Sequence, residues 1–300
     1  MTSLELLASF TIQRLINYFH NVRVFDWKAY FGIAFLGFVR GVEASFSEWL
    51  AYKMLQFTIT IVFYLAFTFS INNCFDIKCD ARQVRKLRKN PIAAGRITFT
   101  EGLILSLCMA SIGLALSYLW FGGCCFLIYS TLVLLSGAYS APPLRLKSIP
   151  LADLFSHSLF FGALLYFYGF LSAGGSINLQ AASLATSISI YSIILELRNH
   201  LEDYKADFNS GAKTAVCWMG YDKSMLLLKT LIVIHILFLT VISHLAGLSY
   251  LSLILALVIF IVLKPQCLKF KHLLRLMDLY TCVMYTLISL PRINLLLNLR

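Results

Sequence analysis

The chain has 300 residues, of which 59% are hydrophobic and only 13% are charged. Soluble domains contain roughly 45–50% apolar and about 25% charged residues, so this composition excludes a disordered protein, a coiled coil and a soluble α/β enzyme. It predicts an all-α polytopic membrane protein. The N-terminal stretch mixes charged with apolar residues and shows no apolar run before a small-residue cleavage site, so we expect no cleaved signal peptide.

Runs of apolar residues with few charges predict about nine membrane-spanning helices. A helix needs about 20 mostly apolar residues to cross the hydrocarbon core, because its backbone polar groups must be satisfied within the segment. In chain order the runs cover residues 29–46, 54–75, 102–144, 154–195, 230–263 and 276–296. The third, fourth and fifth runs are long enough for two helices each, with turns expected at Gly122-Gly123, residues 172–176 and residues 244–247.

The whole chain, residues 1–300, is expected to form a single transmembrane domain, with residues 1–25 as a segment before the first helix. Two charged residues, Arg40 and Glu43, fall inside the first predicted helix. A lone charge is costly in hydrocarbon, so we expect these two side chains, one turn apart, to neutralise each other.

The basic residues support this division into helices. The net charge is +11, and most Lys and Arg residues lie in the connections after the second, fourth, sixth and eighth predicted helices. The connections after the third, fifth and seventh helices contain no Lys or Arg. By the positive-inside rule the basic connections lie on the cytoplasmic side, together with the N-terminal segment. Topology therefore explains the positive charge, and we expect no nucleic-acid partner.

Two of these connections carry the same acidic motif. The pattern N-x-x-x-D-x-x-x-D follows the second predicted helix and, 127 residues later, the sixth. Its members are Asn72, Asp76 and Asp80 in the first copy and Asn199, Asp203 and Asp207 in the second. Residues four apart share one face of a helix, so each copy is expected to form a ladder of oxygen atoms. Like charges one turn apart repel, and a cation between them would relieve the repulsion.

These ladders are suited to Mg²⁺, which prefers one or two carboxylates together with water and substrate phosphates. We assign metal binding to all six motif residues, diphosphate contacts also to the two asparagines, and catalysis to the four aspartates. Further diphosphate contacts are expected from Arg82, Arg145, Lys147, Lys205, Lys213, Tyr139 and Tyr204. One motif alone would more simply be a solvated helix face, and basic residues near a membrane also serve topology and lipid head groups. The second copy favours the metal site.

Four motifs in order resemble the UbiA superfamily of intramembrane prenyltransferases. Beside the acidic motif of residues 72–80 stand NPIAAGRIT at residues 90–98, YSAPPLRLK at 139–147 and LEDYKADFNSGAKT at 201–214. The resemblance implies a helical bundle around a central cavity open to lipid, Mg²⁺ as cofactor, an isoprenyl diphosphate as donor and a hydrophobic, typically aromatic acceptor.

Two positions depart from the pattern of that family. His200 stands where many members have the first aspartate of the second motif, and Asn199 and Glu202 are the available substitutes. Asn90 stands where the family usually has Arg before the proline, which weakens a phosphate-binding role at this position.

The combined interpretation is a Mg²⁺-dependent membrane enzyme that ionises an isoprenyl diphosphate and transfers the prenyl group to an acceptor. Metal and cationic groups would neutralise the developing diphosphate charge, and a dry pocket would protect the allylic cation from water. Three alternatives stay open: a terpene cyclase that needs no acceptor, a polyprenyl-phosphate glycosyl or phosphoribosyl transferase, and a cation-coupled transporter. Transporter sites lie near the bilayer midplane, whereas these acids follow helix ends.

Overall fold

The structure is a computed structural model that describes residues 3–43, 47–248, 253 and 270–297. Every regular element in these ranges is a helix, which confirms the all-α prediction. The chain divides into two compact units, and each is described by itself. Unit 1 comprises Met1–Gly32 and Met54–Ser156, and unit 2 comprises Ile33–Lys53 and His157–Arg300.

Unit 1 is built around two long apolar helices, α3 and α6. Its elements are α1 (Ser3–Asn21), a 3-10 turn (Val24–Asp26), the start of α2 (Lys28–Gly41), most of α3 (Glu48–Phe75), α4 (Ile77–Asp80), α5 (Val84–Lys89), α6 (Phe99–Ser140), a second 3-10 turn (Leu146–Ser148) and most of α7 (Ala152–Ser158). The Thr98 hydroxyl caps α6 by accepting a hydrogen bond from the Glu101 amide, and the Glu101 carboxylate accepts one from the Thr98 amide.

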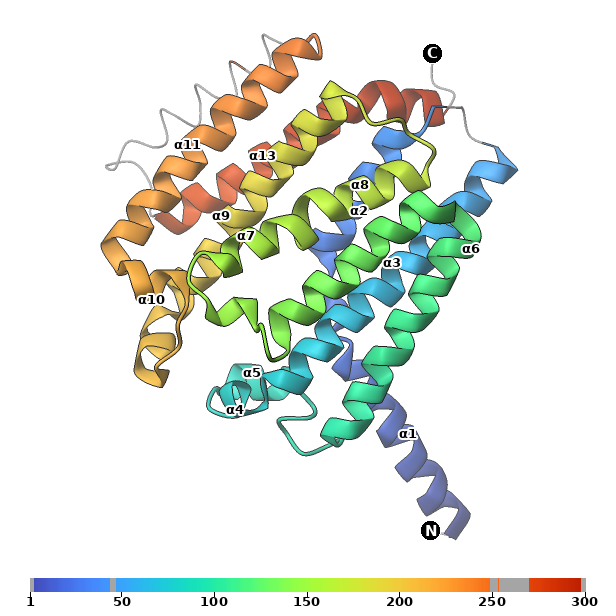
Figure 1. Ribbon diagram of the computed structural model, residues 1–300, viewed down its shortest axis with the longest axis vertical. Helices are drawn as coiled ribbons and strands as arrows, with labels where there is room; N and C mark the ends of the chain where they lie inside the picture. The colour runs from blue at the N-terminus through green and yellow to red at the C-terminus, as the bar shows by residue number, and fades with distance from the viewer. Residues whose placement is uncertain (1–2, 44–46, 249–252, 254–269, 298–300) are drawn as a thin grey trace. The chain divides into compact units, whose positions relative to one another are not determined.

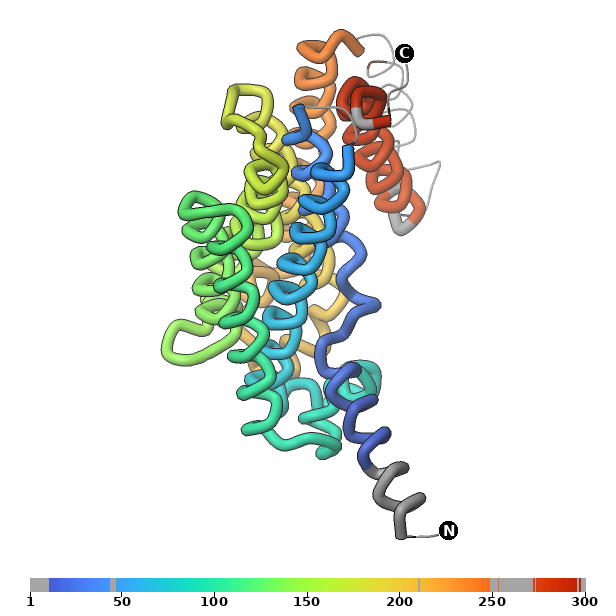
Figure 2. The backbone as a smooth tube through the Cα atoms, turned by 90° about the vertical axis from the view of Figure 1, so that its right-hand side faces the viewer, coloured from blue at the N-terminus to red at the C-terminus, as the bar shows by residue number. Residues whose placement is uncertain are grey.

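Helix α6 consists of two antiparallel arms, as the glycine pair predicted. Gly122 has φ 78° and ψ −172°, a conformation open to glycine, and the chain reverses there (Figure 2). The second arm packs on α3 through buried polar contacts: the Tyr129 hydroxyl donates to the Thr60 carbonyl at 3.0 Å, and the hydroxyls of Tyr64 and Ser136 lie 2.9 Å apart. Both ends of α6 therefore lie at the same end of unit 1 as the end of α3 (Figure 1).

Unit 2 joins the rest of α2 to helices from the second half of the chain. After the last residues of α7, these are a π-helical turn (Leu159–Ala163), α8 (Leu164–Ser172), α9 (Leu179–Ser210), α10 (Ala215–Met219), α11 (Tyr221–Leu245) and α13 (Phe270–Leu296). Helices α9 and α11 lie side by side (Figure 1). Buried hydrogen bonds tie α13 to both, between Thr281 and His235 of α11 and between Tyr285 and Ser187 of α9, each at 3.0 Å.

Helices α2 and α8 approach each other through glycines. A Cβ atom on Gly37 would overlap the Tyr166 carbonyl, one on Gly41 would overlap the Phe170 carbonyl, and one on Gly169 would overlap the Ala34 carbonyl. This is the small-residue packing that lets helix backbones meet in membranes, where lipid supplies no hydrophobic force between helices.

The described helices agree with the predicted spans as far as they extend. Five are long and apolar enough to cross a membrane: Glu48–Phe75, Phe99–Ser140, Ala152–Ser172, Leu179–Asn209 and Tyr221–Leu245. The predicted breaks at residues 172–176 and 244–247 coincide with the ends of α8 and α11. The eighth predicted span lies outside the described residues except for residue 253, and α2, the first span, has only 14 residues. The count of nine stays a prediction.

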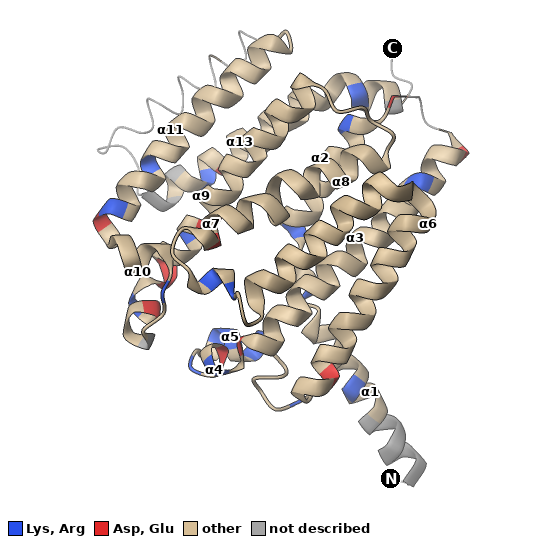
Figure 3. Cartoon of the chain, in the orientation of Figure 1, with Lys and Arg blue, Asp and Glu red and all other residues tan. Residues whose placement is uncertain are grey.

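Charged side chains are rare along the long helices of each unit and concentrate at helix ends (Figure 3). The expected Arg40–Glu43 pair is wrong. Helix α2 ends at Gly41, so Glu43 leaves the helix and is exposed, while Arg40 is buried and donates to the Ile288 carbonyl of α13 at 2.9 Å. A backbone carbonyl thus solvates this buried guanidinium within unit 2.

Candidate functional site at the two acidic motifs

The first motif begins at the end of α3 and continues across a break in the helix. Asp76 lies between α3 and α4 with φ −100° and ψ 6°. The backbone spacing of one turn persists, because the Asp76 amide donates to the Asn72 carbonyl at 3.0 Å and the Asp80 amide to the Asp76 carbonyl at 2.8 Å. The ladder is therefore stacked as expected, although its helix is not continuous.

Two basic side chains from the loop after α6 contact the first two members of this ladder, Asn72 and Asp76. The Lys147 ammonium donates to Asp76 Oδ1 at 2.5 Å and to Asn72 Oδ1 at 2.8 Å. Arg145 lies 3.3 Å from the same Asp76 oxygen, and the Ser140 hydroxyl donates to Asn72 at 3.1 Å. Burial lowers the pKa of Lys147, and the neighbouring Asp76 charge opposes this shift. The predicted site residues Asn72, Asp76, Arg145 and Lys147 thus form one contact group.

Asp80, the third member of the ladder, is bound by an asparagine. It is 6% exposed, and its Oδ2 accepts a hydrogen bond from Asn90 Nδ2 at 2.9 Å. Asn90 also donates to the Asn73 carbonyl and accepts from the amides of Ile92 and Ala93. Burial raises the pKa of Asp80, the Asn90 hydrogen bond opposes this, and the charge of Asp76 adds to the increase. Asn90 is the residue that departs from the family pattern before the proline. Its side chain therefore fixes both Asp80 and the turn at residues 90–93.

The donor set of the first motif fits a hard cation. Within the described ranges, no three His, Cys, Asp or Glu side chains are grouped as a metal cluster. Mg²⁺ does not need such a cluster, because it usually takes one or two carboxylates and completes its shell with water and substrate phosphates. Asn72 and Asp76 offer an amide oxygen and a carboxylate that reach the same ammonium group, so both oxygens point at one position.

The second motif lies on an unbroken helix. Helix α9 runs through all three members to Ser210 and ends at Gly211, which has φ 72°. Asp203 is half-buried and Asp207 is 7% exposed. In this copy the predicted ladder on one continuous helix is correct.

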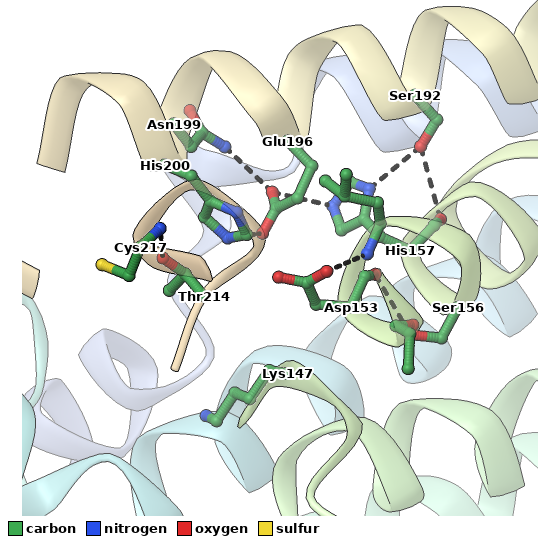
Figure 4. A network of polar contacts seen from close by, with 12 residues as sticks. Lys147, Asp153, Ser156, His157, Ser192, Glu196, Asn199, His200, Thr214 and Cys217 are labelled. Atoms are coloured by element: carbon green, nitrogen blue, oxygen red, sulfur yellow. Dashed lines mark hydrogen bonds and ion pairs between the residues drawn. The ribbon is translucent and has the colours of Figure 1, made fainter. Parts of the chain in front are cut away.

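A buried polar network supports the start of the second motif (Figure 4). Glu196 Oε2 accepts from Asn199 Nδ2 at 3.1 Å and lies 3.4 Å from His157 Nε2, and its Oε1 lies 3.2 Å from His200 Nε2. His157 also lies 3.0 Å from the Ser192 hydroxyl. Every residue of this network belongs to unit 2. His200 thus contacts a carboxylate where the family pattern would place one.

Other predicted contact residues are more loosely arranged. Arg82, Lys205 and Lys213 are exposed, and Tyr139 is half-buried. The ring of Tyr204 lies 5.8 Å from that of Phe208 and 5.6 Å from that of Tyr221, so it packs between α9 and α11.

Sequence reasoning missed two functional neighbours, Glu196 and Ser140. Glu196 stands three residues before Asn199 and four before His200, a helical spacing that could have indicated the network. Ser140 stands in the YSAPPLRLK segment at residues 139–147, between Tyr139 and the two basic residues that were predicted, and this position could have indicated it.

These features define a class of protein: a helical membrane protein with oxygen ligands and cations gathered at the end of its long apolar helices. A model of the UbiA prenyltransferase family matches residues 31–280. The chain therefore belongs to the UbiA prenyltransferase family and is an integral membrane protein, which confirms the resemblance found in the sequence.

Individual relatives extend along most of the chain. It is 25% identical over 288 residues to digeranylgeranylglyceryl phosphate synthase of Sulfurisphaera tokodaii, covering 91% of this chain and 98% of that one. It is 23% identical over 178 residues to a probable chloroplastic homogentisate phytyltransferase 2 of Oryza sativa subsp. japonica, covering 57% and 46%. A UbiA homologue from Archaeoglobus fulgidus, solved bound to GPP and Mg²⁺, has the same fold, with a TM-score of 0.70 at 18% identity over 93% and 99% of the two chains.

Proposed function

We propose that this protein is a Mg²⁺-dependent prenyltransferase that ionises an isoprenyl diphosphate and transfers the prenyl group to a hydrophobic acceptor. The observation that carries this proposal is the contact group of Asn72, Asp76, Arg145 and Lys147. It combines ligands for a hard cation with two cations suited to phosphate oxygens. A solvated polar helix end would not need a lysine that is only 14% exposed and contacts two oxygen ligands.

In this proposal the cationic side chains exchange partners when substrate binds. Bound Mg²⁺ would neutralise charge on the diphosphate oxygens. Asn72 and Asp76 would hold the cation, and Lys147 and Arg145, released from Asp76, would donate to the diphosphate instead. Because Lys147 is only 14% exposed, little water would compete with the phosphate oxygens for its ammonium group.

The second motif would hold a further Mg²⁺ through Asn199, Asp203 and Asp207, with the exposed Lys205 and Lys213 as peripheral diphosphate contacts. Asp80, fixed by Asn90, would contribute charge more than a direct metal bond. For Arg82, Tyr139 and Tyr204 we retain the proposed role of contacting the diphosphate. We also propose that the chain forms one functional domain and that the acidic motifs and the N-terminus face the cytoplasm, as the distribution of Lys and Arg indicates.

The relatives suggest two acceptor classes. One is named for a glyceryl phosphate product and aligns with nearly its whole length, and the other is named for homogentisate, an aromatic acceptor, and aligns with 46% of its length. The resemblance to the UbiA superfamily favours an aromatic acceptor. Both classes belong in the first assay.

The test uses the purified full-length protein in detergent with radiolabelled geranyl, farnesyl and geranylgeranyl diphosphates. Each donor is supplied with Mg²⁺ or EDTA, and with homogentisate, a glyceryl phosphate ether lipid or no acceptor. The proposal predicts a Mg²⁺-dependent prenylated acceptor and its loss in Asp76→Asn. A cyclic hydrocarbon formed without acceptor would replace the transferase by a cyclase. Absence of both turnover and diphosphate binding with every donor would refute the proposal.

A further inference from the structure

Helix α1 carries its apolar side chains on the outside. Ile12, Leu15, Ile16 and Phe19 are each between 41% and 60% exposed. Their spacing of three and four residues places them on one face of the helix. A helix docked on a protein in water would turn this face inward, so the outer surroundings of α1 are apolar.

The opposite face of α1 is polar and docks on the rest of unit 1. Asn21 is fully buried, donates to the Ser70 hydroxyl at 2.5 Å and accepts from Asn73 at 2.9 Å. Glu101, in the first turn of α6, accepts from the Tyr18 hydroxyl at 3.0 Å and forms an ion pair with Arg14. These contacts fix α1 at the charged end of α3 and α6. Such a helix has the pattern of one lying in a membrane interface.

A cavity of about 310 Å³ lies between α1 and the start of α6. It is lined by Gln13, Arg14, Asn17, Gly95, Arg96, Ile97, Thr98 and Glu101, all within unit 1. Glu101 is already occupied by Arg14, Tyr18 and its own helix cap. Arg96 is exposed and forms no ion pair within the described part of the chain. The Arg96 guanidinium can therefore bind an anionic ligand in the cavity.

Asn17 supplies an independent indication that the cavity takes a ligand. Its side chain is 6% exposed, yet its Oδ1 has no hydrogen-bond partner among the described residues. A buried acceptor left without a donor destabilises the fold, so Asn17 Oδ1 calls for a partner. The missing partner is a donor such as a hydroxyl group, while Arg96 requires an anion.

We propose that the cavity beneath α1 binds the head group of a phospholipid that carries both phosphate and hydroxyl groups, as phosphoglycerol does. The phosphate lies beside Arg96, a head-group hydroxyl donates to Asn17 Oδ1, and the acyl chains extend into the apolar layer that also surrounds the outer face of α1. The exposed apolar face of α1 commits the site to a lipid, because it places the helix and the cavity beneath it at the membrane interface. This site is separate from the acidic motifs and does not depend on the proposed catalytic function.

The test measures binding of dihexanoyl phosphatidylglycerol to the full-length protein in detergent by thermal stabilisation, with dihexanoyl phosphatidylcholine as the neutral comparison. Phosphatidylglycerol is expected to bind saturably and phosphatidylcholine at least about 10-fold more weakly, since the choline group adds a positive charge near Arg96 and has no hydroxyl that could donate to Asn17. Arg96→Gln should weaken phosphatidylglycerol about 10-fold or more, and the exposed Arg275→Gln on α13 should leave its affinity unchanged.

Asn17→Leu separates a binding role from a structural one. It removes an unpaired buried acceptor, so the lipid-free protein should keep or gain stability, whereas its affinity for phosphatidylglycerol should fall about 3- to 10-fold. Dihexanoyl phosphatidic acid, which lacks the hydroxyl groups, should bind both proteins equally. Equal binding of phosphatidylcholine, or full affinity in Arg96→Gln, would overturn the proposal. Competition by glycerol 1-phosphate at the same concentration as the lipid would assign the cavity to a soluble phosphate ester instead.

Discussion

Replacing Lys147 by methionine should destabilise the metal-free protein and free the first acidic motif. The Lys147 and Asp76 side chains are only 14% and 16% exposed, and their charged atoms lie 2.5 Å apart. At an effective dielectric constant of about 20, the gross attraction is about 7 kcal/mol. Removing one partner of such a pair typically costs about 3–5 kcal/mol. Arg145 still reaches Asp76, so we expect about 3 kcal/mol.

A double-mutant cycle isolates this interaction. The free energy of unfolding is measured by SDS titration in mixed micelles without metal, for Lys147→Met, Asp76→Asn and the double variant. The double variant should be less destabilised than the sum of the single variants by about 2 kcal/mol or more, because no charge is left unpaired. Lys223→Met, at an exposed lysine of α11, is the matched control and should change little.

Mg²⁺ links the same variant to the proposed function. Without Lys147, the metal no longer competes with an ammonium group for Asp76, so added Mg²⁺ should stabilise Lys147→Met more than the wild type. Product formation should nevertheless fall about 100- to 1,000-fold, the usual loss for one charge-stabilising donor. The reasoning would be refuted if the free energies of unfolding in the cycle were strictly additive and Mg²⁺ stabilised both proteins equally. Lys147 would then not compete with a metal for Asp76.

Further predictions concern the second motif, the metal and the glycine contact. Asp203→Asn should lower product formation at least about 100-fold while circular dichroism of the purified protein stays unchanged. Glu196→Gln should raise the Mg²⁺ concentration needed for half-maximal activity about 10- to 100-fold, because it loosens Asn199. The exposed Glu48→Gln in α3 should not raise it, and equal effects would contradict this. EDTA should abolish turnover, and Mg²⁺ should restore it. Gly169→Ala should cost about 1–3 kcal/mol in SDS unfolding, since a Cβ there overlaps α2.

Most of the helical layout could be predicted because the membrane imposes it. Long apolar runs must be helical to satisfy their backbone, and residues that interrupt the runs mark the turns. Gly122 is an example: its positive φ is one that other residues adopt at a cost, so the glycine pair located the reversal of α6. The break after α8 and the end of α11 were found for the same reason.

Details of the site were harder to predict because they depend on contacts distant in sequence. Periodicity placed Asn72, Asp76 and Asp80 one turn apart, which is correct, but it could not show that the helix breaks at Asp76. The partner of Asp80 is Asn90, which sequence comparison alone marks only as an unusual residue. Lys147 was predicted to bind diphosphate, and its contact with Asp76 depends on how the loop after α6 folds back.

The two acidic motifs repeat in spacing but not in surroundings. In the first, an amide and a carboxylate oxygen are bound by a lysine, so a cation that enters must displace a charged hydrogen bond. In the second, Asn199 is held through its amide nitrogen by Glu196, which leaves the amide oxygen directed away from that contact. The first copy is therefore blocked until a diphosphate offers Lys147 another anion, whereas the amide oxygen of the second needs no displaced cation. This difference predicts that occupation of the first motif by Mg²⁺ depends on the diphosphate, which metal titration with and without a non-hydrolysable diphosphate can measure.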